Sequence, residues 1–253
     1  MQRLIAGEAR KLATTRLWLW LLLASVGLTV LYAVLTIAFA DTPDALTRPL
    51  SSREGQRTLF AVGAAAAPFA ALLGAIGLTG EYRHRTATAT FLATPQRGRV
   101  VVAKLITYAF AGVGYAVVNL AVTAAIVLPW LASNRTSVAV GPGDLAATAA
   151  GVVSTVALFG LIGVGLGALL RDQVATVVAL MVYLFLVENI LTNIRSLHDW
   201  TPYLPGQAEE ALVGSTLTHQ QLLAPWQGGL LLAAYGLVLA VAGVWLAVRR
   251  DVT

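Results

Sequence analysis

Six long apolar runs constrain this chain more than any other feature of its sequence. They cover roughly residues 17–40, 59–79, 105–130, 145–170, 174–191 and 229–248. A helix needs about 20 apolar residues to cross a bilayer. The chain is 58% hydrophobic and only 11% charged, which excludes an ordinary soluble globule because such a surface needs more charge. We therefore predict an all-α integral membrane protein with six transmembrane helices in a single domain, residues 1–253.

The distribution of basic residues predicts the orientation of the chain. Cytoplasmic loops of membrane proteins carry an excess of Lys and Arg. The segments richest in these residues are 1–16 and 80–104, and both fall on the same side as the two termini. We expect a multi-pass protein of the plasma membrane with both termini in the cytoplasm. Because this bias accounts for the net charge of +5, a nucleic-acid partner is not required.

Residues 1–16 are predicted to form a short helix on the membrane surface. Apolar residues recur in this segment at helical spacing, at Leu4, Ile5, Ala9, Leu12 and Ala13. Glu8 and Arg16 intrude on that apolar face. A frayed basic tail is the alternative.

Small residues and one proline predict how the spans pack. Gly163 and Gly167 form a GxxxG pattern in the fourth span, which is typical of close helix packing in lipid or of a hinge. Pro68 is expected to kink the second span.

The sequence lacks the motifs of the common enzymes. It has no cysteine, no GxxxxGK[ST] nucleotide loop, no HExxH and no GxSxG. The three histidines fall in predicted loops, so an intramembrane serine protease would lack its base. Glu209-Glu210 is similar to the paired glutamates of CAAX-protease-like enzymes, but Gly214 stands where that motif has Arg. We expect neither catalysis nor a metal or cofactor site on this chain.

One predicted outer loop gathers side chains of types that bind metals. These are His198, Asp199, Glu209, Glu210 and His219. Their spacing matches no metal motif, and we expect a solvated loop.

The segment 80–104 is longer than a turn between two spans requires. Residues 82–92 are predicted to form a short surface helix, which Pro95 would end. Lys104 is expected to extend to the lipid head groups. A basic loop that only fixes orientation is the alternative.

Within this segment, Glu81, Thr86, Pro95, Arg97 and Lys104 follow one another in an order that resembles the membrane subunit of ABC-2 type transporters. Those permeases carry a Glu, a Thr, a Pro with a nearby Arg, and a Lys that opens the third span. Arg85 stands where a glycine is usual. The resemblance extends over 80–104 in residues and over the whole chain in hydropathy.

The resemblance implies a permease subunit of an ATP-driven exporter. The loop between spans two and three would be a coupling helix that docks on a separate ATPase subunit, which binds ATP and Mg. Residues 1–16 would lean on that subunit, and 192–227 would form an extracellular cap of short helices. Two permeases, identical or different, would pair through spans one and five around a path for a small amphipathic or hydrophobic substrate. The residues implied in coupling are Glu81, Arg83, Arg85, Thr86, Pro95, Arg97, Lys104, Arg171 and Asp172. A permease-like anchor or sensor without transport is one alternative, and an intramembrane enzyme is another.

Polar residues within the spans are candidates for the substrate path or an outer gate. They are Asn119, Tyr183, Glu188 and Asn189. Glu188 is the acidic residue set within a span, where charges are costly and often functional. The alternative for Glu188 is a surface ion pair with Arg195.

Overall fold

The computed structural model describes residues 1–40, 48–84, 97–215 and 222–249 of the chain. These residues form helices and their connections, with no strand among them. Six helical segments in the described chain are long and apolar enough to cross a membrane: Leu17–Ala38, Arg53–Arg83, Gly98–Ser133, Pro142–Leu170, Gln173–Asn193 and Pro225–Gly243. The chain thus has the architecture of a multi-pass membrane protein, as the apolar runs predict.

The N-terminal segment is helical. Helix α1 (Gln2–Thr14) precedes α2 (Leu17–Ala38), and the backbone breaks helical hydrogen bonding between them at Thr15 and Arg16. The frayed tail considered as an alternative is therefore wrong.

The second span begins earlier and ends later than its apolar run indicates. It consists of α3 (Arg53–Ala61), the 3₁₀ segment η1 (Val62–Ala66) and α4 (Ala67–Arg83). Ser52 starts it, because its hydroxyl accepts a hydrogen bond from the Gly55 amide at 3.1 Å. Pro68 lies in the first turn of α4, and the backbone hydrogen-bond pattern of the span is 3₁₀ rather than α-helical just before it. This is the expected consequence of a residue that lacks an amide hydrogen.

The third span also extends beyond its apolar run. Helix α6 (Arg97–Ser133) begins seven residues before Lys104, so this lysine lies within the helix rather than at its opening. The connection between α4 and α6 is correspondingly shorter than 80–104. Helix α7 (Pro142–Leu170) follows after a short turn.

The fifth span is irregular, and a series of short helices follows it. Helix α8 (Gln173–Val182) passes through the π-helical segment η2 (Tyr183–Val187) into α9 (Glu188–Asn193). The described residues of the connection to the last helix form three short helices in the region where a cap was predicted: η3 (Arg195–Leu197), η4 (Thr201–Tyr203) and α10 (Pro205–Val213). The last helix is α11 (Pro225–Arg249).

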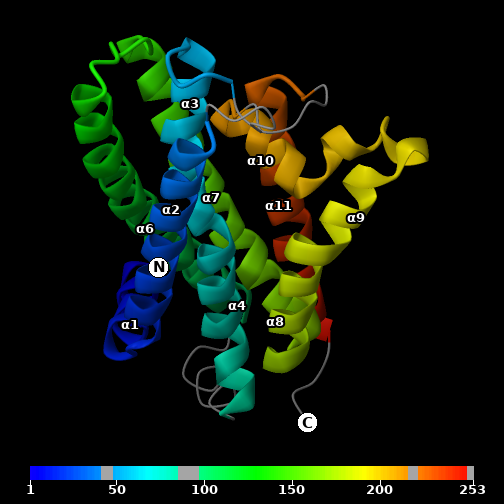
Figure 1. Cartoon of the computed structure of the whole chain (residues 1–253). Helices are drawn as coiled ribbons and strands as arrows, with labels where there is room; N and C mark the ends of the chain where they lie inside the picture. Colours follow the sequence, from blue (N-terminus) through cyan, green and yellow to red (C-terminus); the bar gives the residue numbers. More distant parts are fainter. Residues whose placement is uncertain (41–47, 85–96, 216–221, 250–253) are drawn as a thin grey trace.

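The bundle has two distinct ends (Figure 1). One, called here the α1 end, carries α1, the C-terminal end of α4 and the turn between α7 and α8. The opposite α10 end carries α3, the turn between α6 and α7, and α10. The segments predicted to share the cytoplasmic side thus lie at one end.

Helix α7 is central, packing against α4, α6 and α11. Its glycines permit this packing. A Cβ on Gly163 would overlap the carbonyl oxygen of Ala71 in α4, and one on Gly165 would lie 2.7 Å from the Cβ of Leu239 in α11. A Cβ on Gly167 would lie 3.1 Å from the Ala75 oxygen, so the GxxxG pair faces α4 as a packing surface.

Two spans are left largely uncovered by the rest of the chain. In the most apolar 18-residue stretch of each span, only 17% is buried in α2 and in the α8–α9 span. The corresponding share is 67% for the α3–α4 span and 61% for α7. The fifth span has exposed large apolar side chains at Val174, Val178, Phe185, Leu186 and Ile190.

Candidate functional site: an ionic cluster joining α1, α4 and α6

Lys104 is a buried cation. Its side chain is 1% exposed, in the second turn of α6. Its ammonium nitrogen lies 2.5 Å from Oε2 of Glu8 in α1, 2.9 Å from Oε1 of Glu81 in α4 and 3.3 Å from the Gly77 carbonyl oxygen. Three acceptors thus surround a cation that has left water, the condition under which burial of a charge is tolerated. The expectation that Lys104 extends to the lipid head groups is wrong.

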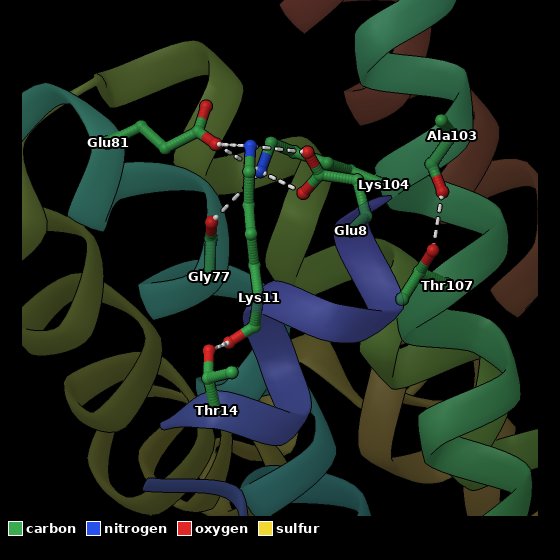
Figure 2. Close-up of polar contacts among 8 residues, drawn as sticks. All are labelled: Glu8, Lys11, Thr14, Gly77, Glu81, Ala103, Lys104 and Thr107. Carbon is green, nitrogen blue, oxygen red and sulfur yellow. Dashed lines mark hydrogen bonds and ion pairs between the residues drawn. The ribbon is translucent and has the colours of Figure 1, made fainter. Parts of the chain in front are cut away.

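A second lysine completes the cluster. The Lys11 ammonium on α1 lies 2.7 Å from Oε1 of Glu8 and 2.7 Å from Oε1 of Glu81. Figure 2 shows the two carboxylates and the two ammonium groups alternating around one point. We call these four residues, Glu8, Lys11, Glu81 and Lys104, the ionic cluster. Its formal charges balance, and its bonds join three helices that are distant in the sequence.

Exposure within the ionic cluster is graded. The Lys104, Glu8 and Glu81 side chains are 1%, 7% and 12% exposed, whereas Lys11 is 50% exposed. Partial burial lowers the pKa of Lys11, but its hydrogen bonds to Glu8 and Glu81 and their charges outweigh this and raise the pKa above its ordinary value. Lys11 is therefore a cation at neutral pH and closes the cluster toward the exterior.

Helical spacing places two pairs of these groups each on one helix face. Glu8 and Lys11 are three residues apart on α1, and Gly77 and Glu81 are four apart on α4, so each pair shares a helix face. Buried Tyr108 lies one turn beyond Lys104 and fills the space at Gly77, where a Cβ would overlap the phenol. The Tyr108 ring thus packs against α4 directly beside the cluster.

The structure brings together two predicted residues and adds two that were not predicted. Glu81 and Lys104 were both assigned to coupling. Among the described residues, Glu81 forms ion pairs with the two lysines of the cluster. Arg83 donates to the Gln173 side chain at 3.5 Å. Glu8, an apparent intrusion on the apolar face of α1, is the signal that marked a buried partner.

Other predicted coupling residues have separate positions. Arg85, Thr86 and Pro95 lie outside the described residues, and Arg97 is the first residue of α6. Asp172 caps α8, because its carboxylate accepts a hydrogen bond from the Ala175 amide at 2.7 Å.

Arg171 ends α7 in a left-handed conformation, with φ of 56°. Its guanidinium carbon lies 5.8 Å from the centroid of the Tyr82 ring on α4. Its Nε and Nη2 atoms are buried and have no hydrogen-bond partner among the residues that the structure describes. The α7–α8 turn therefore rests on the last turn of α4, directly after Glu81.

Glu188 has a different partner from the one considered. It is 6% exposed and accepts hydrogen bonds from the amides of Gly206 at 2.6 Å and Gln207 at 3.2 Å, at the start of α10. A carboxylate at a helix N-terminus is stabilised by the free amides and the helix dipole. The surface pair with Arg195 is therefore wrong, and Glu188 fastens the fifth span to α10.

The remaining polar candidates are held within the chain. Asn119 is fully buried; its side chain accepts from Thr29 at 2.8 Å and donates to Ser25 at 3.0 Å, which joins α6 to α2. Asn189 is exposed and donates to the Phe185 carbonyl at 3.0 Å. Tyr183 begins the π-helical segment. No group of three or more potential metal ligands occurs in the described residues, and His219 lies outside them.

The chain matches no protein-family model and no curated protein.

Proposed function

We propose that this chain is the membrane-spanning permease subunit of an ATP-driven exporter, similar to the ABC-2 type, in the plasma membrane with both termini in the cytoplasm. The observation that carries the proposal is the ionic cluster. It joins α1 to the last turns of α4 and the first turns of α6. A partner that pushes on α1 or on the connection between α4 and α6 would therefore move both flanking helices.

The cluster suits force transmission better than substrate binding. Its acceptors are occupied by its own lysines, and its least exposed member is the cation itself. Removing one partner from such a buried pair costs about 3–5 kcal/mol. That cost is the penalty of leaving the remaining charge buried without its partner, so the cluster is costly to open, which a coupling element requires. The Arg171 turn, stacked on Tyr82 beside Glu81, extends the same surface.

ATP and Mg would be bound by a separate ATPase subunit, since the chain carries no nucleotide loop. The ATPase would contact α1, the connection after α4 and the Arg171 turn. The substrate class that fits the largely aliphatic spans is a small amphipathic or hydrophobic molecule.

A second permease copy, identical or different, would cover α2 and the fifth span. These two spans expose their apolar side chains, which a bilayer tolerates but which also provide a pairing surface. The π-helical segment in the fifth span adds a local irregularity of the kind often found at functional sites. Cysteine crosslinking from Leu186 across two copies tests this pairing, because the native chain has no cysteine to interfere.

The decisive experiment is purification of the tagged chain from its own cells in mild detergent. We expect a soluble ATPase in stoichiometric amount and Mg-dependent ATP hydrolysis after reconstitution in liposomes. Purification of the chain without an ATPase would refute the proposal. An ATPase that binds but drives no movement of any solute would favour a permease-like anchor or sensor.

A further inference from the structure

An apolar groove of about 330 Å³ lies between α1, α6 and the start of α2. Helix α1 contributes Ile5, Ala9 and Leu12, helix α6 contributes Phe110 and Ala111, and Trp18 of α2 is also part of the lining. The volume falls at the lower end of the range for ligand pockets. Phe110 is 71% exposed, so the groove opens to the outside of the bundle.

The groove begins close to the ionic cluster along α6. Its α6 wall starts at Thr107, three residues after Lys104 of the ionic cluster, and continues to Ala111. Four residues of helix cover about 6 Å. The groove thus extends from the level of the ionic cluster into the region of the apolar spans. Trp18, at the start of α2, is the residue type that prefers the membrane–water interface.

The N-terminal segment that supplies one wall of the groove carries positive charge. Arg3, Arg10 and Arg16 are exposed, and no ion pair in the described part of the chain includes any of them. Arg10 follows Ala9 of the groove wall, and Arg16 precedes Trp18 by two residues. The two carboxylates nearest in the fold, Glu8 and Glu81, are already bound by Lys11 and Lys104. In the described part of the chain, the charge of these arginines is therefore not neutralised by an ion pair.

We infer that this groove binds one acyl chain of an anionic phospholipid, whose phosphate is held by Arg10 and Arg16. The apolar lining suits a hydrocarbon chain, and the arginines supply bidentate donors to phosphate oxygens. The bound lipid would fill the space between α1 and α6 and hold α1 in the position that the ionic cluster requires. This site does not depend on transport, so it stands or fails separately from the proposed function.

Trp18 provides a direct probe of the groove. The chain is reconstituted in vesicles of phosphatidylcholine that contain phosphatidylglycerol, with bromine on the acyl chains of one lipid at a time. The chain has six tryptophans, so the Trp18 contribution is obtained as the difference in quenching between the native chain and the Trp18→Phe variant. We expect brominated phosphatidylglycerol to quench Trp18 more strongly than brominated phosphatidylcholine at equal mole fraction.

Three variants test the parts of the site. Arg10→Gln and Arg16→Gln should each lower the relative affinity for phosphatidylglycerol about fivefold, the contribution of one arginine near an anionic surface. Ala9→Phe should fill the groove and reduce quenching by both lipids. The matched controls are Arg135→Gln at the opposite end of the bundle and Ala6→Phe on α1, outside the groove lining; both should leave the preference unchanged.

Two results would overturn the inference. Equal quenching by both lipids, unaffected by the arginine variants, would mean that the groove holds ordinary bilayer lipid without selection. Absence of Trp18 quenching by either lipid, while the 65% exposed Trp20 is quenched, would mean that protein covers the groove.

Discussion

Replacing Lys104 with Met tests whether the ionic cluster holds α1 in place. The change removes a cation that is 1% exposed and leaves Lys11 as the remaining cation of the cluster for Glu8 and Glu81, which are only 7% and 12% exposed. Removing one partner of a buried ion pair costs about 3–5 kcal/mol. Since each 1.4 kcal/mol is a factor of about ten, the equilibrium between docked and released α1 should shift by roughly two to three and a half powers of ten.

The measurement is a distance between spin labels on cysteines placed at Ala6 of α1 and Val102 of α6, both exposed. The absence of native cysteine makes this labelling specific. In the native chain we expect one narrow distance distribution. In Lys104→Met it should become broad and longer, because α1 leaves the bundle.

Two further variants separate charge imbalance from general damage. Glu8→Gln combined with Lys104→Met leaves Glu81 and Lys11 as a balanced pair, so it should recover part of the loss, with a coupling energy of about 0.5–3 kcal/mol. Arg53→Gln breaks a comparable but exposed bidentate contact to Asp144 at the other end of the bundle and should leave the distance unchanged. An unchanged distance in Lys104→Met would refute the role assigned to the cluster.

Three other predictions follow from packing, electrostatics and topology. Gly163→Val should destabilise the bundle by about 1–3 kcal/mol because its side chain would meet the Ala71 carbonyl, while Gly143→Ala, with open space around it, should not; thermal unfolding in detergent compares them. Partial burial, followed by the charges of Glu210 and Glu188, raises the pKa of Glu209 in α10 to about 8 from its ordinary 4.5. The folded state thus favours the protonated acid, so the stability of α10 should be greatest below pH 4.5 and should fall as the pH rises through about 8. Hydrogen exchange of the α10 amides measures this stability. The Glu209→Gln variant should show no such dependence on pH. Cysteines at Ser51 and Ser137 should react with a membrane-impermeant reagent in intact cells and one at Thr14 should not; the reverse pattern would invert the proposed orientation.

The spans were predictable because a bilayer forces every backbone polar group to bond within its own helix, which requires long apolar runs. The residues at which the spans begin and end were harder to predict. Helix α6 continues through Lys104 to Arg97, since a charged residue can remain helical when its partners come from other helices. The change to 3₁₀ geometry before Pro68 follows from the proline itself.

The partners within the candidate site could not be read from the sequence. Lys104 and Glu8 are 96 positions apart, and spacing carries no information on which helices meet. Glu188 likewise binds backbone amides at the start of α10, and a backbone partner leaves no residue-type signal. Glu8 alone gave a hint, because an acidic residue on the apolar face of a surface helix is costly unless a cation meets it.

The central claim is that force from an ATPase subunit passes through the ionic cluster to the far end of the bundle. The direct test is the distance between spin labels at Ser137 and Ser196, both at the α10 end, in the purified complex with its ATPase, before and after Mg-ATP and vanadate. We predict that the distance changes in the native chain. In Glu8→Gln combined with Lys104→Met it should not change, although the ATPase remains bound and hydrolyses ATP before vanadate is added. The same nucleotide-dependent change in both proteins, or none in the native chain, would contradict the account.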